Sequence, residues 1–221
     1  MESAAAIAHP LAILKPSVPP LRYSLEEYLR REEKSVERHD YYDGQIIRIP
    51  MARGSHNIIA MNTGSAIKFA LKTQHKKYIV FSSNQKVFLP ALNFGIYPDA
   101  LVVCEKPMYW DDNEVLLINP LLIVEVLSRS TSAYDRGDKF SEYKTLPSFK
   151  EYVLIEQTGV RVESRFREEP DLWRETIVTD PDGLIPLKSI GCSISLADIY
   201  ENIEFPPVTK PKRRKASTTR S

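Results

Sequence analysis

The sequence predicts an α/β (α+β) fold in which a central mixed β-sheet is flanked by helices. Short segments rich in Val, Ile, Leu and Phe fill the centre of the chain, as the strands of a buried sheet do. A strand, a helix and another strand then follow one another, an order that places two parallel strands in one sheet. Further along, apolar and charged residues alternate over residues 160–166, which indicates an antiparallel strand with one face in solvent. Parallel and antiparallel strands together make the sheet mixed.

The first part of the chain predicts a short helix, a hairpin and a longer helix. Ser24 followed by Glu27 is the pattern of a capping box, so a helix is expected to begin there and to end near residue 31. Asp43-Gly44 is a hairpin turn signal within residues 41–50. Ser55 is expected to cap a longer helix, whose small and apolar residues fall on one broad face that packs on the sheet.

The remainder predicts the sheet and its crossover helix. The segments 99–104 and 121–127 are almost entirely apolar, so both are expected to be buried on both faces. The crossover is expected to be one helix over residues 133–146, ended by Pro147. Ser195 is expected to cap a last short helix. The predicted strands are residues 78–81, 85–89, 99–104, 121–127, 151–156, 160–166 and 173–179.

The composition is that of a globular chain with one core. Of the 221 residues, 43% are hydrophobic and 27% charged, and no apolar run reaches the roughly 20 residues of a membrane span. A single domain is expected over residues 23–205, between a disordered or extended segment at 1–22 and a basic disordered tail at 206–221. The tail holds six of the 30 Lys and Arg and no acid, which leaves 24 basic and 29 acidic residues elsewhere, a net charge of −5. A domain with this net charge is not expected to bind nucleic acid through its overall charge, although a local basic groove remains an alternative.

The cysteines and the first residues indicate a cytoplasmic location. Cys104 and Cys192 lie far apart without a CxxC partner or a nearby His, so both are expected to be reduced core residues. The chain begins without a cationic segment, and prolines interrupt its first apolar run, so no signal peptide is expected. No membrane partner is expected either.

Because the familiar catalytic and nucleotide-binding motifs are absent, carboxylates are expected to be the catalytic or metal-binding groups. The sequence has no GxxxxGK, GxGxxG, GxSxG or HExxH, and its four His are scattered. Glu125 interrupts the apolar run 121–127, and a buried carboxylate requires a metal, a cation or hydrogen-bond donors as its partner. Pro98-Asp99 opens another apolar strand. If the two carboxylates lie on adjacent strand ends, they could share a Mg²⁺ ion that orients water toward a phosphodiester.

A stripe on the crossover helix supplies a possible third group. Asp135, Lys139 and Tyr143 recur at i, i+4 and i+8, and Lys139 could point back over the end of the strand that holds Glu125. Simpler interpretations stay open. A purely structural ion pair between Glu125 and Lys139 competes on even terms with metal binding, the stripe could be a solvated helix face, and Asp99 could be a turn residue.

A series of short motifs runs through the chain in one order. They are Tyr41-x-Asp43-Gly44, His56 at a helix start, Pro98-Asp99, Val124-Glu125-Val126-Leu127-Ser128 with Ser130-Thr131, Asp135-x-x-x-Lys139-x-x-x-Tyr143, and Glu151-Tyr152. This order resembles the Uma-type putative restriction endonuclease family, which belongs to the PD-(D/E)XK nuclease superfamily. The resemblance covers about residues 23–203 and is most specific from Val124 to Tyr152.

The resemblance implies a restriction-endonuclease-like core in which Asp99 and Glu125 are metal ligands. The superfamily pattern has a Lys two residues after the Glu, but that position is Leu127 here, and Lys139 on the following helix is the matching residue. The implied activity is Mg²⁺-dependent endonucleolytic hydrolysis of DNA phosphodiester bonds, with Mn²⁺ as a possible substitute. By analogy with the superfamily, a homodimer is expected.

Several positions depart from the family pattern or carry a second interpretation. Asp40 stands where the family tends to have Glu, Arg129 where Pro is usual, and Glu156 where Asp is common. Asp40 and His56 are peripheral site candidates, with a hairpin and a capping or surface role as their simpler alternatives. A catalytically inactive nuclease-like module that binds nucleic acid or a protein partner is the alternative function. A structural interaction protein that acts through its basic tail is a third.

Overall fold

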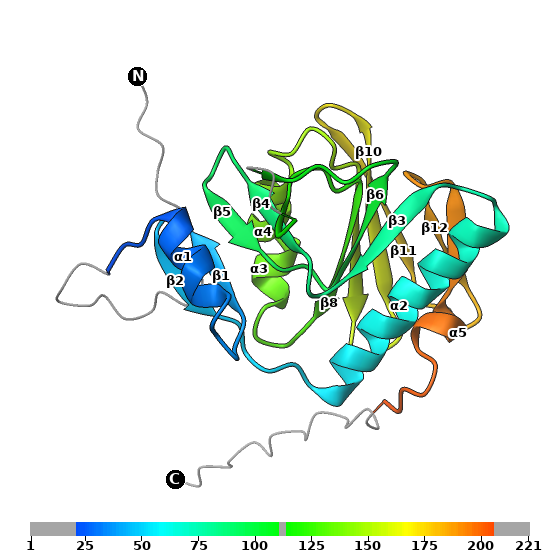
Figure 1. The fold of residues 1–221 in the computed structure, drawn as a ribbon. Helices are drawn as coiled ribbons and strands as arrows, with labels where there is room; N and C mark the ends of the chain where they lie inside the picture. Colours follow the sequence, from blue (N-terminus) through cyan, green and yellow to red (C-terminus); the bar gives the residue numbers. More distant parts are fainter. Residues whose placement is uncertain (1–20, 111–113, 206–221) are drawn as a thin grey trace, which may run out of the picture.

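A six-stranded sheet forms the centre of the fold. The computed structural model in Figure 1 describes residues 21–110 and 114–205. The strand order of the sheet is β11-β10-β9-β8-β6-β3. β8 (Leu122–Leu127) and β9 (Glu151–Glu156) are parallel, and every other neighbouring pair is antiparallel. The other strands are β3 (Tyr78–Ser82), β6 (Ala100–Cys104), β10 (Val162–Glu169) and β11 (Leu172–Val178). The predicted mixed sheet flanked by helices is therefore confirmed.

A second sheet, with the order β2-β1-β5-β4-β7, lies beside the first. Its hairpin turns at Asp43 and Gly44, whose positive φ angles of 42° and 94° are those of the predicted tight turn. Three of its strands were expected from the sequence, whereas β5 and β7 are too short to give a pattern. The strands are β1 (His39–Tyr42), β2 (Gln45–Arg48), β4 (Lys86–Leu89), β5 (Phe94–Ile96) and β7 (Leu116–Leu117).

The long helix α2 (Gly54–Thr73) packs against one face of the six-stranded sheet, as Figure 1 shows. Its buried residues recur every four positions: Ile59, Thr63, Ile67 and Leu71. Alternate residues of β8 face this core, and the residues between them face a second core on the other side of the sheet. The helix begins at Gly54 with Arg53 as its N-cap, so the prediction that Ser55 caps it is wrong.

The short helix α1 (Leu25–Glu32) begins as predicted. The Ser24 side chain accepts a hydrogen bond from the Glu27 backbone N–H at 3.1 Å. The Glu27 carboxylate does not close the other half of the capping box, because it pairs with Arg30 and Arg31.

The crossover between β8 and β9 consists of two short helices, α3 (Ser132–Arg136) and α4 (Asp138–Tyr143). The prediction of one helix over residues 133–146 is wrong. Gly137 breaks it with φ −110° and ψ −90°, and its N–H is shared between the carbonyls of Ala133 and Tyr134. The sequence pattern of the two helices is continuous, so only the glycine itself indicated the break.

The C-terminal part adds a hairpin of β12 (Leu184–Leu187) and β13 (Cys192–Ser195), then α5 (Leu196–Ile199). Both cysteines are free; Cys192 is buried, but Cys104 is exposed at the end of β6, so its predicted core position is wrong. Residues 1–20 of the N-terminal segment predicted at 1–22, and the whole basic tail at 206–221, lie outside the described residues. Within residues 21–110 and 114–205, no helix has the length and apolar character needed to cross a membrane.

Candidate active site

Asp99 and Glu125 lie close together where β6 and β8 pair. The antiparallel register of the two strands runs from Ala100 opposite Val124 to Val102 opposite Leu122, and Asp99 directly precedes it. The Asp99 N–H donates to the Val124 carbonyl at 3.1 Å, and the Asp99 carboxylate accepts the Val126 N–H, so Asp99 contacts β8 on both sides of Glu125 along the strand. The carboxylates of Asp99 and Glu125 are therefore neighbours at this end of the strand pair.

Glu125 is 4% exposed and has two donors on the same oxygen. Its Oε1 lies 2.7 Å from Lys139 Nζ and accepts a hydrogen bond from the Tyr143 hydroxyl at 3.0 Å. Burial raises the pKa of Glu125 well above its usual value; the Lys139 ammonium opposes this shift, while Asp99 adds to it. The ion pair that the sequence left open as a structural alternative is thus present, and it occupies one of the two carboxylate oxygens.

Lys139 is itself buried, on α4, and lies 3.7 Å from a second carboxylate, Asp135 Oδ1. Burial alone would lower the pKa of Lys139, but Glu125, Asp135 and Asp40 outweigh it and hold that pKa above its ordinary value. Lys139 is therefore an ammonium group at neutral pH. The interpretation of Asp135, Lys139 and Tyr143 as a solvated helix face is wrong, because all three are buried.

Asp99 is held by contacts to β8 and to α2. Its Oδ2 accepts the Val126 N–H at 2.7 Å and lies 3.2 Å from Nε2 of His56, in the first turn of α2. Burial lowers the pKa of His56, but the neighbouring Asp99 carboxylate outweighs it and raises that pKa above 6.5. Asp99 is thus more than a turn residue, and His56 is more than a surface or capping residue.

Asp40 makes no direct contact with Asp99, Glu125 or Lys139. Its Oδ1 accepts the Tyr97 N–H at 3.0 Å, and no hydrogen bond or ion pair joins it to Asp99, Glu125 or Lys139. Burial raises its pKa to about 6, against the lowering influence of Lys139. The structure therefore brings Asp99, Glu125, Lys139 and His56 together, whereas Asp40 communicates with them through its charge.

The burial of Leu127 explains why the lysine of the site lies on a helix rather than on β8. It is 1% exposed and packs in the apolar core between the two sheets, where a Lys side chain would be buried without a polar partner. From the sequence, Tyr143 and Asp135 had no assigned role beyond their spacing from Lys139. The i, i+4, i+8 pattern was the one signal that could have identified both as site residues.

The carboxylates fit a hard divalent cation of the kind the resemblance implies. One oxygen of each, Asp99 Oδ1 and Glu125 Oε2, accepts no hydrogen bond from the described residues. No group of three or more His, Cys, Asp or Glu in residues 21–110 and 114–205 has a metal-holding arrangement. Mg²⁺ commonly uses one or two carboxylates and completes its shell with water and substrate phosphate, so two free carboxylate oxygens suit it.

Comparison with known proteins gives the chain its relatives. The family model Uma2, described as "Putative restriction endonuclease", matches residues 25–197. Two uncharacterized proteins of Synechocystis sp. (strain ATCC 27184 / PCC 6803 / Kazusa) are similar in sequence. The protein sll1609 is 36% identical over 137 residues, which cover 62% of this chain and 76% of the relative. The protein slr1290 is 32% identical over 191 residues, which cover 86% of this chain and 97% of the relative.

A solved structure shares the fold. It is the crystal structure of a putative nuclease belonging to DUF820 from Anabaena variabilis ATCC 29413. It superposes with a TM-score of 0.62 at 22% identity, over 82% of this chain and 98% of that one.

Proposed function

Because the chain belongs to the Uma2 family of putative restriction endonucleases, we propose that it is a Mg²⁺-dependent endonuclease that hydrolyses phosphodiester bonds of DNA. One observation carries the proposal: the Asp99 carboxylate contacts the β8 backbone next to Glu125, and a buried ammonium lies 2.7 Å from the Glu125 carboxylate. In the reaction, a water oxygen bonds to phosphorus, the bond to the leaving oxygen breaks, and that oxygen takes up a proton.

The proposed roles follow from the charge of each group. Asp99 and Glu125 would hold Mg²⁺ or Mn²⁺ through their free oxygens, and the bound ion would supply positive charge to the phosphate and lower the pKa of a water. Lys139 is protonated, so it would stabilise negative charge on the phosphate oxygens rather than act as a base. His56 would position Asp99, and Tyr143 would position Glu125. Asp40 would tune the charge of Lys139 from a distance.

Cleavage assays test the proposal directly. Purified protein is incubated with plasmid and linear DNA in Mg²⁺ or Mn²⁺, alongside Asp99→Ala and Glu125→Ala. Both substitutions are expected to abolish cleavage. Asp171→Ala is the matched control, because Asp171 is an exposed acid between β10 and β11 and should keep full activity. Cleavage that survives both site substitutions would refute the assignment.

The ion pair favours a second candidate, a nuclease-like module that binds nucleic acid or a protein without cutting. In such a module, Glu125 would stay committed to Lys139 and Tyr143. Calorimetry with Mg²⁺ separates the two functions, because only the enzyme should take up metal in a manner that Asp99→Ala removes. By analogy with superfamily members that cut both strands, we also propose a cytoplasmic homodimer with residues 23–205 as its domain, which sedimentation analysis would test for its oligomeric state.

A further inference from the structure

Two arginines differ from all others in the described part of the chain. Residues 21–110 and 114–205 contain twelve arginines, and ten of them donate to a carboxylate or a backbone carbonyl. The ten are Arg22, Arg30, Arg31, Arg38, Arg48, Arg136, Arg161, Arg165, Arg167 and Arg174. Arg53 and Arg129 have no partner among the described residues, and both are exposed.

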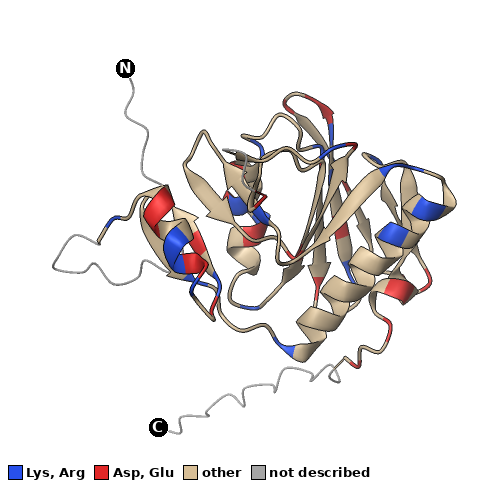
Figure 2. Cartoon of the chain, viewed as in Figure 1, with Lys and Arg blue, Asp and Glu red and all other residues tan. Residues whose placement is uncertain are grey.

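Both unpaired arginines flank the candidate active site. Arg53 is the N-cap of α2, three residues before His56, and Arg129 lies in the loop after β8, four residues after Glu125. Figure 2 shows basic segments at the start of α2 and in the loop between β8 and α3. Asp99 Oδ2 contacts both His56 Nε2 and the Val126 N–H. Each arginine therefore lies three residues along the chain from a group that contacts the Asp99 carboxylate.

The Asp99 carboxylate contacts the first turn of α2 at His56, but no acid among the described residues pairs with Arg53 at the N-cap. The first turn holds no acidic residue of its own, and the Arg53 side chain does not cap its free N–H groups. A cation at the positive end of a helix dipole is unfavourable, so a residue with no internal partner adds an electrostatic cost there. An anion from outside the chain would remove that cost. Ser130 and Thr131 add hydroxyl groups next to Arg129, in the loop after β8.

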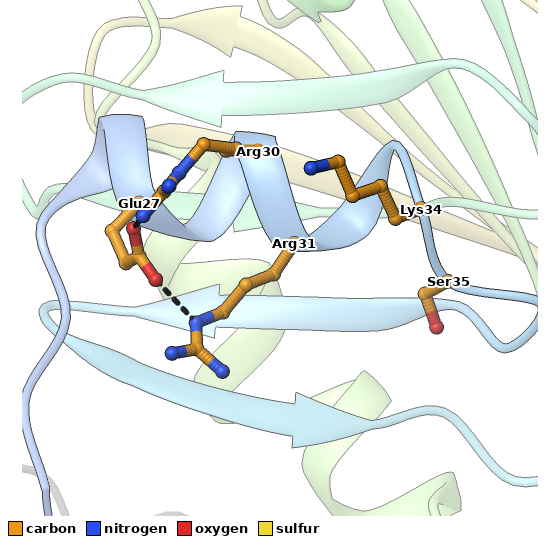
Figure 3. A pocket seen from close by; sticks show the side chains of 5 residues that line it. All are labelled: Glu27, Arg30, Arg31, Lys34 and Ser35. Carbon is orange, nitrogen blue, oxygen red and sulfur yellow. Dashed lines mark hydrogen bonds and ion pairs between the residues drawn. The ribbon is translucent and has the colours of Figure 1, made fainter.

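The arginines of helix α1 show the contrast. Figure 3 shows the hollow beside it, lined by Glu27, Arg30, Arg31, Lys34 and Ser35. The carboxylate of Glu27 pairs with both arginines, so their charge is compensated within the helix. No acid does this for Arg53 or Arg129. Residues 1–205 carry a net charge of −5, so these two unpaired cations do not reflect a general excess of positive charge.

Resting on the proposed function, we propose that Arg53 and Arg129 bind backbone phosphate groups of duplex DNA that flank the scissile phosphodiester. A guanidinium group binds phosphate through two parallel hydrogen bonds, and arginine remains charged at any working pH. Contacts to phosphate fix the register of the duplex without reading its bases. The two arginines are therefore positioning residues, whose loss should weaken binding equally on any sequence.

Salt-dependent binding tests the inference without cleavage. A short fluorescein-labelled duplex is titrated by anisotropy in EDTA, from about 50 to about 200 mM NaCl. Arg53→Gln and Arg129→Gln are each expected to weaken binding about tenfold at low salt and to reduce the salt slope by about one unit. The double variant should lose about two units. Arg53→Lys and Arg129→Lys keep the charge and should keep most of the slope.

A matched control removes an arginine elsewhere. Arg174 is exposed on β11, at the far edge of the six-stranded sheet, and pairs with Glu168, so Arg174→Gln should leave the slope unchanged. Thermal melting confirms that each variant is folded. A reduced slope for both flanking variants, with an unchanged control, supports the inference.

Three results separate this inference from the proposed function. If the wild type binds and cuts DNA but both Gln variants keep its slope, the role of the arginines is overturned and the endonuclease stands. If the slopes fall as expected but no cleavage occurs in Mg²⁺ or Mn²⁺, the arginine contacts stand and the endonuclease is overturned. If the wild type binds no duplex, or binds only single strands or RNA, the inference about duplex phosphates fails.

Discussion

Replacing Lys139 by Met is expected to destabilise the protein strongly at neutral pH. The substitution keeps the volume of the side chain but removes the ammonium 2.7 Å from Glu125 and 3.7 Å from Asp135. Both carboxylates are 4% exposed, so water cannot replace the lost charge. Removing one partner of a buried ion pair typically costs about 3–5 kcal/mol of unfolding free energy.

The double variant Glu125→Gln/Lys139→Met should recover part of this loss. A neutral amide still accepts the hydrogen bond from Tyr143 and no longer needs a cation. Glu125→Gln alone should cost less than Lys139→Met, because Lys139 keeps Asp135 as a partner. The coupling energy between the two sites is expected to be about 2 kcal/mol, within the range for residues in contact.

Urea unfolding of the four proteins at pH 7 measures this cycle. The deficit of Lys139→Met should shrink at pH 5. Burial already raises the pKa of Glu125, and loss of Lys139 raises it further, so the folded variant binds a proton more tightly than the unfolded chain. Its stability is therefore present at low pH and lost as pH rises above about 4.5, by up to about 1.4 kcal/mol per pH unit.

A surface ion pair provides the control. Lys188 lies 3.7 Å from Glu168 on a partly exposed face, so Lys188→Met should change the unfolding free energy by less than about 1 kcal/mol. Additive effects of the Glu125 and Lys139 substitutions, with a coupling below about 0.5 kcal/mol, would contradict the buried pair.

Three further substitutions test other parts of the fold. Glu151 is fully buried and accepts four hydrogen bonds, so Glu151→Ala should lower the unfolding free energy by at least about 3 kcal/mol in urea titrations. Glu151→Gln should lower it by less, and equal losses would contradict the role of the acceptor oxygens. Leu127→Lys in the Lys139→Met background restores the superfamily spacing but places an amine in an apolar core, so it should destabilise the protein further and restore no DNA cleavage. Recovered cleavage would show that a lysine on β8 can replace Lys139. The pKa of Asp40 in the folded protein is about 6 against an ordinary 3.8, so its contribution to stability is lost as pH rises from about 4 to about 6. The unfolding free energy of the wild type minus that of Asp40→Asn should therefore fall across this window, and a constant difference would contradict the raised pKa.

The sequence predicted the elements that a local pattern encodes. The cap at Ser24, the Asp43-Gly44 turn and the apolar runs of β6 and β8 each gave a recognisable signal, and the structure contains all of them. Glu125 was also recognisable, because a single acid in an apolar run needs a partner. The strand pairing that brings Asp99 next to it followed from no local pattern, since strand pairing depends on contacts far apart in sequence.

What the sequence left unresolved depended on packing. The stripe of Asp135, Lys139 and Tyr143 reads as polar, yet the second sheet and β8 bury it, and periodicity cannot distinguish a solvated face from a buried polar one. The break at Gly137 required the close approach of the Ala133 carbonyl, which would lie 3.2 Å from a Cβ at that position. The short strands β5 and β7 exist through their neighbours in the sheet rather than through their own composition.

Because the crossover breaks at Gly137, Lys139 and Glu125 lie on elements of unequal stability. Glu125 belongs to β8, which is hydrogen-bonded to strands on both sides, whereas Lys139 belongs to a helix of six residues. A helix this short has no stability of its own and keeps its place only by packing. Local opening of the crossover would therefore withdraw the cation while the carboxylates stayed in the sheet. During synthesis, likewise, the proposed catalytic centre would stay incomplete until this segment had docked.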